Sequence, residues 1–210
     1  MPLASIYRKG GGPTVSFDFI DLITGTAYQT FLLANTSDTG GDDSVLTSQS
    51  IFSDEIETVD VIPADTDVST KIDDHDFDIP VNIPQTLEGE AIVNLNFTVT
   101  GAVAGTMQGF LIVKIIHYDG STETTLATSQ SETLSRGELK QLSFSMTVAN
   151  TRFVKGDTIR LNIESWGIST DAVTTANIAY GTDPRNREGT NLGVGETTIG
   201  YFYAPFDVQL

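Results

Sequence analysis

The sequence predicts an all-β protein, an antiparallel β-sandwich built as an eight-stranded jelly roll with an N-terminal extension. Runs rich in Val, Ile, Thr and Phe alternate with polar residues, whereas the periodicity of an amphipathic helix is almost absent. Gly, Asp, Asn and Ser separate these runs at spacings that suit a sandwich or a closed barrel. The strand order does not follow from the sequence, so an immunoglobulin-like topology is the alternative.

Three segments show the alternation of half-buried antiparallel strands most clearly, at residues 92–99, 142–148 and 158–166. The side chains predicted to point inward are Val93, Leu95, Phe97, Val99, Leu142, Phe144, Met146, Val148, Ile159, Leu161 and Ile163. In the third segment, Trp166 falls on the outward face.

Residues 110–118 are apolar at nearly every position and are interrupted by Lys114. This pattern fits a central strand covered on both faces, or a strand with one face covered by another subunit. The Asp-Gly pair that follows predicts a tight hairpin turn into a strand over residues 122–128. Further strands are expected at 177–180 and at 197–208, where Pro205 ends or bends the strand.

The N-terminal part of the chain has a different pattern. Residues 1–13 are predicted to be a flexible arm, because a run of glycines precedes Pro13. Residues 14–69 are predicted to be a β extension that packs on the sandwich or on a neighbouring subunit, with strands near 14–20 and 27–33. The polar segment at 35–44 is expected to be a flexible loop. Residues 70–210 then form the jelly roll.

The charge balance excludes several partners. The chain has 28 Asp and Glu against 11 Lys and Arg, a formal net charge of −17. Such a surface repels phosphate backbones and anionic membranes, so neither nucleic acid nor a membrane is an expected partner. No apolar stretch approaches the roughly 18 residues of a membrane span, and the N-terminus does not resemble a secretory signal. The chain is therefore expected to be soluble as made.

Residues suited to catalysis are sparse. The chain has no cysteine and two histidines, His75 and His117. It shows no Gly-x-Ser-x-Gly elbow, Walker A loop, dinucleotide fingerprint or His-Glu-x-x-His pair. The sequence therefore predicts no catalytic residue and a protein that is not an enzyme. A glycan hydrolase or lyase is the enzymatic alternative, and it would need a cleft with perturbed carboxylates.

Residues 73–78 are the candidate metal site, because they hold four aspartates and one histidine. In a strand, Asp74, Asp76 and Asp78 share one face, where their charges repel and a hard cation such as calcium would relieve the repulsion. The spacing does not match an EF-hand loop. A solvated acidic edge that discourages edge-to-edge pairing is the competing interpretation. No cofactor other than calcium is expected.

Aromatic and apolar side chains at strand spacing are the candidate contact residues. The predicted subunit contacts are Phe110, Leu111, Ile112, Tyr201 and Tyr203. Trp166 is the only tryptophan, and it is the candidate ligand-binding residue, because exposed aromatic rings on a sheet can stack on sugars.

Two segments carry a resemblance to a known class of proteins. Residues 152–161, Arg-Phe-Val-Lys-Gly-Asp-Thr-Ile-Arg-Leu, resemble the turn and strand common in viral and trimeric jelly rolls. Residues 179–187, Ala-Tyr-Gly-Thr-Asp-Pro-Arg-Asn-Arg, are similar to C-terminal regions of jelly-roll virion proteins of tailed phages and tailed archaeal viruses. The segments at 17–21 and 25–31 also look like the start of small phage structural proteins.

This resemblance implies a non-enzymatic virion structural protein of the capsid decoration, turret or minor capsid type. Such a subunit would stabilise or ornament the particle as a homo-trimer or pentamer, with other capsid or virion proteins as partners. Its location would be the virion, after synthesis in the host cytoplasm. The alternative is a lectin-like or adhesin module that binds a carbohydrate or a host receptor, for which an exposed aromatic or calcium-lined pocket is expected.

Overall fold

The computed structural model describes residues 15–16, 26–38, 41–101, 106–171 and 174–207. All regular secondary structure in these ranges is β-strand, which confirms the all-β prediction. The predicted arm at 1–13 and most of the predicted strand at 14–20 lie outside the described residues. Among the residues that are described, no helix is long and apolar enough to cross a membrane.

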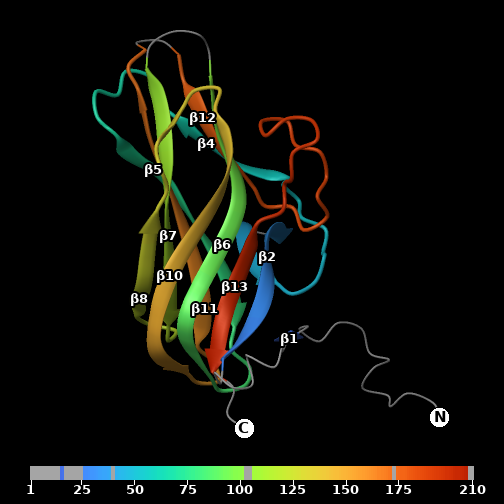
Figure 1. Cartoon of the computed structure of the whole chain (residues 1–210). Helices are drawn as coiled ribbons and strands as arrows, with labels where there is room; N and C mark the ends of the chain where they lie inside the picture. Colours follow the sequence, from blue (N-terminus) through green and yellow to red (C-terminus); the bar gives the residue numbers. More distant parts are fainter. Residues whose placement is uncertain (1–14, 17–25, 39–40, 102–105, 172–173, 208–210) are drawn as a thin grey trace, which may run out of the picture.

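The strands form an elongated sandwich of two layers (Figure 1). The first layer contains β2 (Thr26–Asp38), β4 (Glu57–Ile62), β6 (Gln85–Gly101), β10 (Leu139–Phe153), β12 (Ala176–Gly181) and β13 (Tyr201–Asp207). The second layer contains β5 (Thr70–Pro80), β7 (Met107–Tyr118), β8 (Glu123–Gln130), β9 (Leu134–Ser135) and β11 (Thr158–Ser169). The two short or bridging strands are β1 (Val15–Ser16), which pairs with β2, and β3 (Gly41–Thr47).

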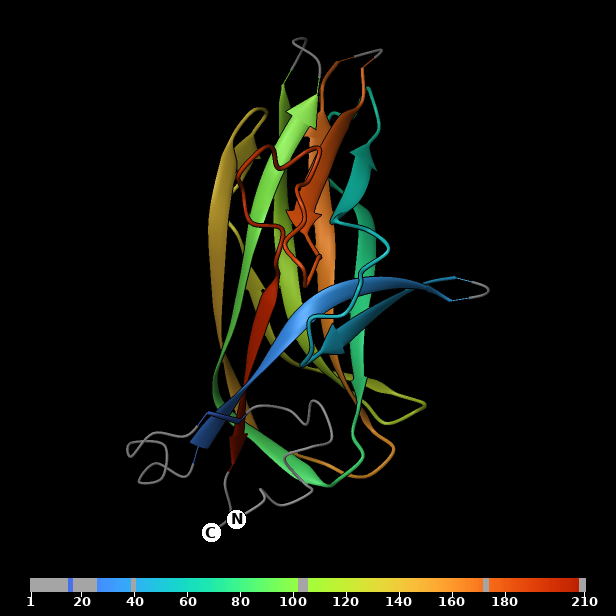
Figure 2. The same ribbon diagram turned by 90° about the vertical axis from the view of Figure 1, so that its right-hand side faces the viewer.

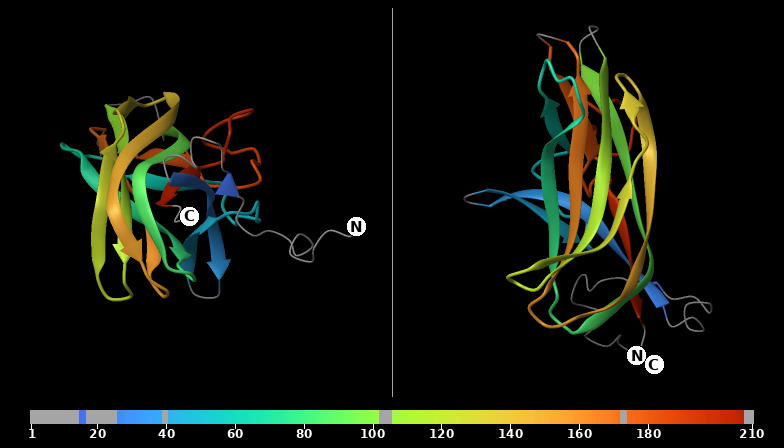
Figure 3. Two further views of the ribbon diagram at one scale, coloured as in Figure 1. Left: turned by 60° about the horizontal axis from the view of Figure 1, so that its bottom comes forward. Right: turned by 90° about the vertical axis from the view of Figure 1, so that its left-hand side faces the viewer.

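Hydrogen bonds connect the strands in the order β4-β12-β6-β13-β2-β3-β5-β11-β7-β8, and β10 pairs with the other edge of β6. All pairings are antiparallel except that of β3 with β5, which joins Val45 to Asp78. The β2–β3 hairpin crosses the sandwich obliquely and extends beyond it, so it links the two layers (Figure 2). β5 and β6, β6 and β7, and β10 and β11 are consecutive in the sequence but lie in opposite layers, as in a jelly roll (Figure 3).

The core fills the space between the layers and confirms the predicted inward positions. The prediction of half-buried strands holds for β10 but not fully for β6 and β11, because Asn96, Thr98, Asn162 and Glu164 on their opposite faces are buried too. Every side chain predicted to point inward from residues 92–99, 142–148 and 158–166 is buried. Those residues lie on β6, β10 and β11, and the inner side chains of β7 join them in one cluster. Each such side chain stabilises the fold by about 1.5–3 kcal/mol relative to an exposed position.

Two predicted turns are also confirmed, and both need a glycine in the left-handed region. Gly120 has a φ of 91° in the β7–β8 hairpin, and Gly156 has a φ of 102° before β11. The Asp119 carboxylate accepts backbone N–H bonds from Ser121 at 2.9 Å and from Thr122 at 2.7 Å, which fixes the first turn.

The prediction of a flexible loop over residues 35–44 is wrong. β2 and β3 pair as a hairpin from Leu32–Thr47 out to Asp38–Gly41. Thr and Ser are compatible with a strand, so the Gly and Asp residues mark the end of a hairpin and not a long loop. Residues 26–62 also contribute β2 and β4, which pair with β13 and β12, so this part of the predicted extension packs as strands of the sandwich itself.

The apolar strand β7 is central, because it lies between β11 and β8. Its inner residues Leu111, Val113 and Ile115 are fully buried, whereas Phe110 and Ile112 on the outer face are half-buried. The described chain therefore covers one face of this strand completely and the other only in part.

Candidate functional site

Half-exposed tyrosines gather on the outer face of β2, β6 and β13. This tyrosine face consists of Tyr28, Thr30, Ile92, Asn94, Tyr201 and Tyr203. The residues lie side by side, because Tyr203 pairs with both Thr30 and Ile92 in the sheet. The rings of Tyr201 and Tyr203 stack with centroids 6.0 Å apart and planes at 19°. Five of these residues, all except Tyr201, line a shallow hollow of about 460 Å³.

The surroundings of Tyr203 favour the neutral form of its hydroxyl group. Partial burial, followed by the charge of Tyr201, raises the pKa of Tyr203 above its usual value. A neutral tyrosine offers an apolar ring with a hydrogen-bonding tip, which is the chemistry found in the centres of protein interfaces.

A second aromatic pair lies on the outer face of the other layer. Phe110 on β7 and Trp166 on β11 are register partners, and their rings stack with centroids 6.0 Å apart and planes at 12°. The indole N–H of Trp166 donates to Glu164 Oε2 at 3.1 Å. Leu111 lies in the core of the chain, so among the predicted contact residues of β7 only Phe110 and Ile112 are accessible to a partner.

The acidic strand β5 places three aspartates on one face, as its sequence predicts, and basic residues of the same chain neutralise their charge. Asp74, Asp76 and Asp78 face outward opposite Glu164, Asn162 and Arg160 of β11.

The guanidinium of Arg160 contacts Asp78 Oδ1 at 2.7 Å and Asp76 Oδ2 at 2.9 Å. The hydrogen bonds to Asp78, followed by the nearby carboxylates, raise the pKa of Arg160 above its already high value. Lys71 contacts Asp74 at 3.1 Å. Arg160 and Lys71 thus relieve the repulsion for which calcium was predicted, and calcium binding at these three aspartates stays a prediction.

The Arg160→Met substitution removes this counter-charge and keeps most of the apolar side chain. The Arg160 side chain is only 14% exposed. We expect the free energy of unfolding to fall by about 2 kcal/mol, because two partly buried carboxylates lose their cation. Urea unfolding at neutral pH measures this loss. The matched control is Arg152→Met, because Arg152 is an exposed residue of β10 that makes no ion pair within the described ranges. This change should alter stability by less than about 0.5 kcal/mol. Equal losses in both variants would contradict the assignment.

A polar cluster extends from the interior to the surface of the sandwich where β4 faces β5 and β11, and we call it the inter-layer cluster. It consists of Asp60, Asp73, His75, Ser165 and Tyr180. His75 Nε2 lies 2.9 Å from Asp60 Oδ1, and the Ser165 hydroxyl donates to the other oxygen of Asp60. The His75 ring meets the edge of Tyr180 with centroids 6.2 Å apart. One ligand atom each from Asp60, Asp73 and His75 lies within 4.8 Å of the others.

The charges and the burial of this cluster shift the pKa values of His75 and Tyr180. Burial lowers the pKa of His75, but the hydrogen bond to Asp60 and the nearby carboxylates of Asp60, Asp73 and Glu55 outweigh it and raise the net pKa. Complete burial, followed by the charge of Asp60, raises the pKa of Tyr180 well above its usual value. Residues 73–78 were predicted as a metal site on their outward aspartates, but the cluster uses Asp73 and His75 of the opposite face. Asp60 carries no motif, and its one signal is its place on the inward face of a short alternating strand.

The raised pKa of His75 predicts how stability depends on pH in the presence of a metal chelator. Because the folded-state pKa lies above the unfolded value near 6.5, the protonated ring stabilises the fold fully below about pH 6.5. This contribution is lost as the pH rises through the folded-state pKa. Urea unfolding between pH 5.5 and 9 should therefore show that the stability advantage of the wild type over His75→Gln shrinks as the pH rises. If the free energies of unfolding of the two proteins changed in parallel with pH, the pKa of His75 would not be raised in the folded state.

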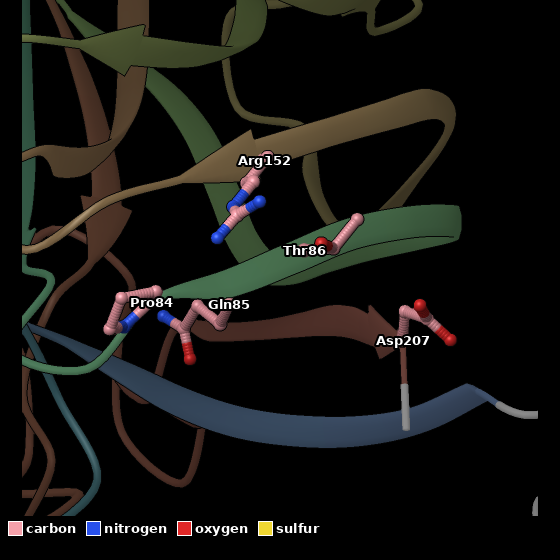
Figure 4. A pocket seen from close by; sticks show the side chains of 5 residues that line it. All are labelled: Pro84, Gln85, Thr86, Arg152 and Asp207. Carbon is pink, nitrogen blue, oxygen red and sulfur yellow. The ribbon is translucent and has the colours of Figure 1, made fainter. Parts of the chain in front are cut away.

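Two further places hold polar residues without converging chemistry. His117, the second histidine, lies 2.7 Å from Asp157 and packs on Phe153, next to the turn at Gly156. A polar recess of about 260 Å³ lies where β6 begins and β10 and β13 end (Figure 4). Figure 4 shows the guanidinium of Arg152 extending over β6, while the carboxylate of Asp207 points away from it.

Comparison with known proteins shows the fold. No family model and no curated protein matches the chain. A solved α-amino acid ester hydrolase matches with 13% identity and a TM-score of 0.57, over 84% of this chain and 36% of that one. An aminopeptidase from a marine sediment archaeon, Thaumarchaeota archaeon, matches with 9% identity and a TM-score of 0.55, over the same shares. The chain thus spans about a third of the length of these hydrolases, and identities this low show the fold alone.

A viral structure is also similar, but much less so. The structure of infectious bursal disease virus, Gx strain, matches with 14% identity over 95% of this chain and 47% of that one. Its TM-score is 0.21, which is too low to carry an argument.

These comparisons correct one expectation. The prediction that the protein is not an enzyme is contradicted, because two structures that it matches, with TM-scores of 0.57 and 0.55, are an ester hydrolase and an aminopeptidase. That prediction was drawn from missing local motifs. Catalytic groups that converge from distant strands leave no such motif, so its absence does not exclude catalysis.

Proposed function

We propose that the chain is a structural subunit of a virus particle that contacts its neighbours through the tyrosine face. The observation that carries this proposal is the gathering of Tyr28, Tyr201 and Tyr203 with Ile92 on one outer sheet face. Aromatic residues are enriched in the centres of protein interfaces, and exposed apolar patches mark contact sites. The resemblance of residues 152–161 and 179–187 to jelly-roll virion proteins supports a virion as the place of that contact.

The shape of the face supports a protein partner. Thr30 and Asn94 border the tyrosines with polar groups, which gives an apolar centre and a polar rim. The shallow hollow of this face can accept a different surface of a neighbouring copy, and such head-to-tail contacts close into rings. We propose a homo-trimer or pentamer, with other capsid or virion proteins as further partners and a position on the outside of the particle.

The double substitution Tyr201→Thr and Tyr203→Thr tests this proposal, because threonine preserves strand propensity and removes the rings. Light scattering after size exclusion should show an oligomer for the wild type and a monomer for the variant. The control is Val59→Thr with Val61→Thr, which removes exposed apolar groups from the outer face of β4 and should leave the oligomer intact. A wild type that is monomeric at all concentrations would overturn the proposal. A monomer that retains binding to a glycan array through Tyr201 and Tyr203 would replace it with the lectin-like alternative.

A second candidate is a β-sandwich that works as part of a hydrolase. The specific observation in its favour is the match to the ester hydrolase and the aminopeptidase with TM-scores of 0.57 and 0.55. The chain corresponds to about a third of each, so it would work beside a further hydrolytic unit or supply groups to it. Assays of the purified chain with α-amino acid esters and aminoacyl amides test this candidate. Turnover above that of a heat-denatured sample supports a hydrolase role. Turnover equal to that of the denatured sample shows that the chain by itself does not hydrolyse these substrates.

A further inference from the structure

The inter-layer cluster brings together metal-ligating groups from both layers of the sandwich. Asp60 lies on β4 and is 3% exposed, whereas Asp73 and His75 lie on β5 and face the same way as inward Ser165 and Ile163. One oxygen of Asp60, one oxygen of Asp73 and one nitrogen of His75 lie within 4.8 Å of one another. The ligands come from strands that share no hydrogen-bonded pairing, so a common ion would bridge them directly.

A second observation points to a missing ligand at the same place. The Tyr180 hydroxyl is completely buried and makes no hydrogen bond of good geometry to the described residues, although Thr58 lies close enough to lower its pKa slightly against the effect of burial. It lies close enough to Asp60 and Asp73 for their charges to act on it, and its ring meets His75 edge-on. Buried hydroxyl groups are almost always hydrogen-bonded, so an unpaired one calls for an unrecorded partner. A bound ion with its water would supply that partner.

We propose that Asp60, Asp73 and His75 bind one divalent transition-metal ion, with zinc as the preferred ion, and that this ion fastens β4 to β5 across the two layers. This proposal does not depend on the proposed function.

The ligand set selects the class of metal. Carboxylates alone suit calcium or magnesium, whereas an imidazole with carboxylates suits zinc and its neighbours. Ligand atoms about 2.1 Å from zinc lie roughly 3.4 Å apart in a tetrahedron. His75 Nε2 and Asp60 Oδ1 are 2.9 Å apart, so a shift of a few tenths of an ångström opens the site. The ion takes the place of the proton between these two atoms, and that proton is released to solvent.

The surroundings provide support and access. The Ser165 hydroxyl holds the second oxygen of Asp60, which orients the carboxylate toward His75. In the proposed site, a water on the remaining coordination position would supply the hydrogen-bond partner of the buried Tyr180 hydroxyl. Asp73 is exposed, so an ion can reach the three ligands from solvent at this side chain.

The experiment uses the full chain after treatment with a chelator, titrated with Zn²⁺, Co²⁺ and Ca²⁺ by calorimetry. Asp73→Asn removes one ligand, and Asp74→Asn makes the same charge change on the opposite face of the same strand. Both residues are exposed, so both variants should fold, and thermal unfolding in chelator checks this. We expect one equivalent of Zn²⁺ or Co²⁺ to bind. Affinity should fall at least 10-fold in Asp73→Asn and by less than about 2-fold in Asp74→Asn.

Thermal unfolding supplies an independent readout. Zn²⁺ should raise the melting temperature of the wild type and of Asp74→Asn, and should leave that of Asp73→Asn unchanged. The absence of a Zn²⁺ binding heat in the wild type would overturn the proposal. So would an equal loss of affinity in both variants, which would show unspecific binding to the acidic surface. Preferential binding of Ca²⁺ that Asp74→Asn abolishes would place the ion on the outer aspartates and would also overturn it.

Discussion

The packing of β6 and β10 against β7 and β11 is the interaction on which the rest of the structure depends. The inward side chains of these strands form one continuous apolar cluster. Because successive residues of a strand point to opposite faces, each inward position also fixes its outward neighbours. The core register therefore places Trp166 beside Phe110, and the same rule on β13 turns Tyr201 and Tyr203 outward. A slip of one residue would bury these aromatic rings and expose the core.

The apolar packing ends where β4 closes the sandwich, and there the interior becomes polar. Asp60 and Ser165 are buried, and each is satisfied by a hydrogen bond from or to the other layer. The segment after β12 is also held by buried acids, since Glu57 accepts backbone N–H bonds from Asn191 and Leu192. Burial of such polar groups is tolerated only when they are hydrogen-bonded or ion-paired. The stability of this end of the sandwich therefore depends on individual hydrogen bonds, whereas that of the rest of the core depends on apolar packing.

The sequence was most informative where structure is local. The inward positions in three segments and the turns at Gly120 and Gly156 were predicted correctly, because each depends on neighbouring residues and on a φ that favours glycine. The β2–β3 hairpin was missed, because its polar residues resemble a loop until the partner strand is known.

Features that depend on strand order could not be predicted. The pairing of Arg160 with Asp78 requires β5 to lie beside β11, although the residues are 82 positions apart. The same limit hid the inter-layer cluster, whose members come from β4, β5, β11 and β12. The prediction that the protein is not an enzyme has a related weakness. It depends on motifs of neighbouring residues, whereas catalytic groups can converge from strands that are distant in the sequence.

Hydroxyl-radical footprinting of the assembled and the dissociated protein tests most directly whether the register of the core exposes a contact face. The account predicts that Tyr201 and Tyr203 are labelled strongly in the dissociated protein and are protected on assembly. Phe52, which is 54% exposed and is not a member of the tyrosine face, is the internal reference and should be labelled equally in both states. Equal labelling of Tyr201 and Tyr203 in both states, with protection elsewhere, would contradict the account.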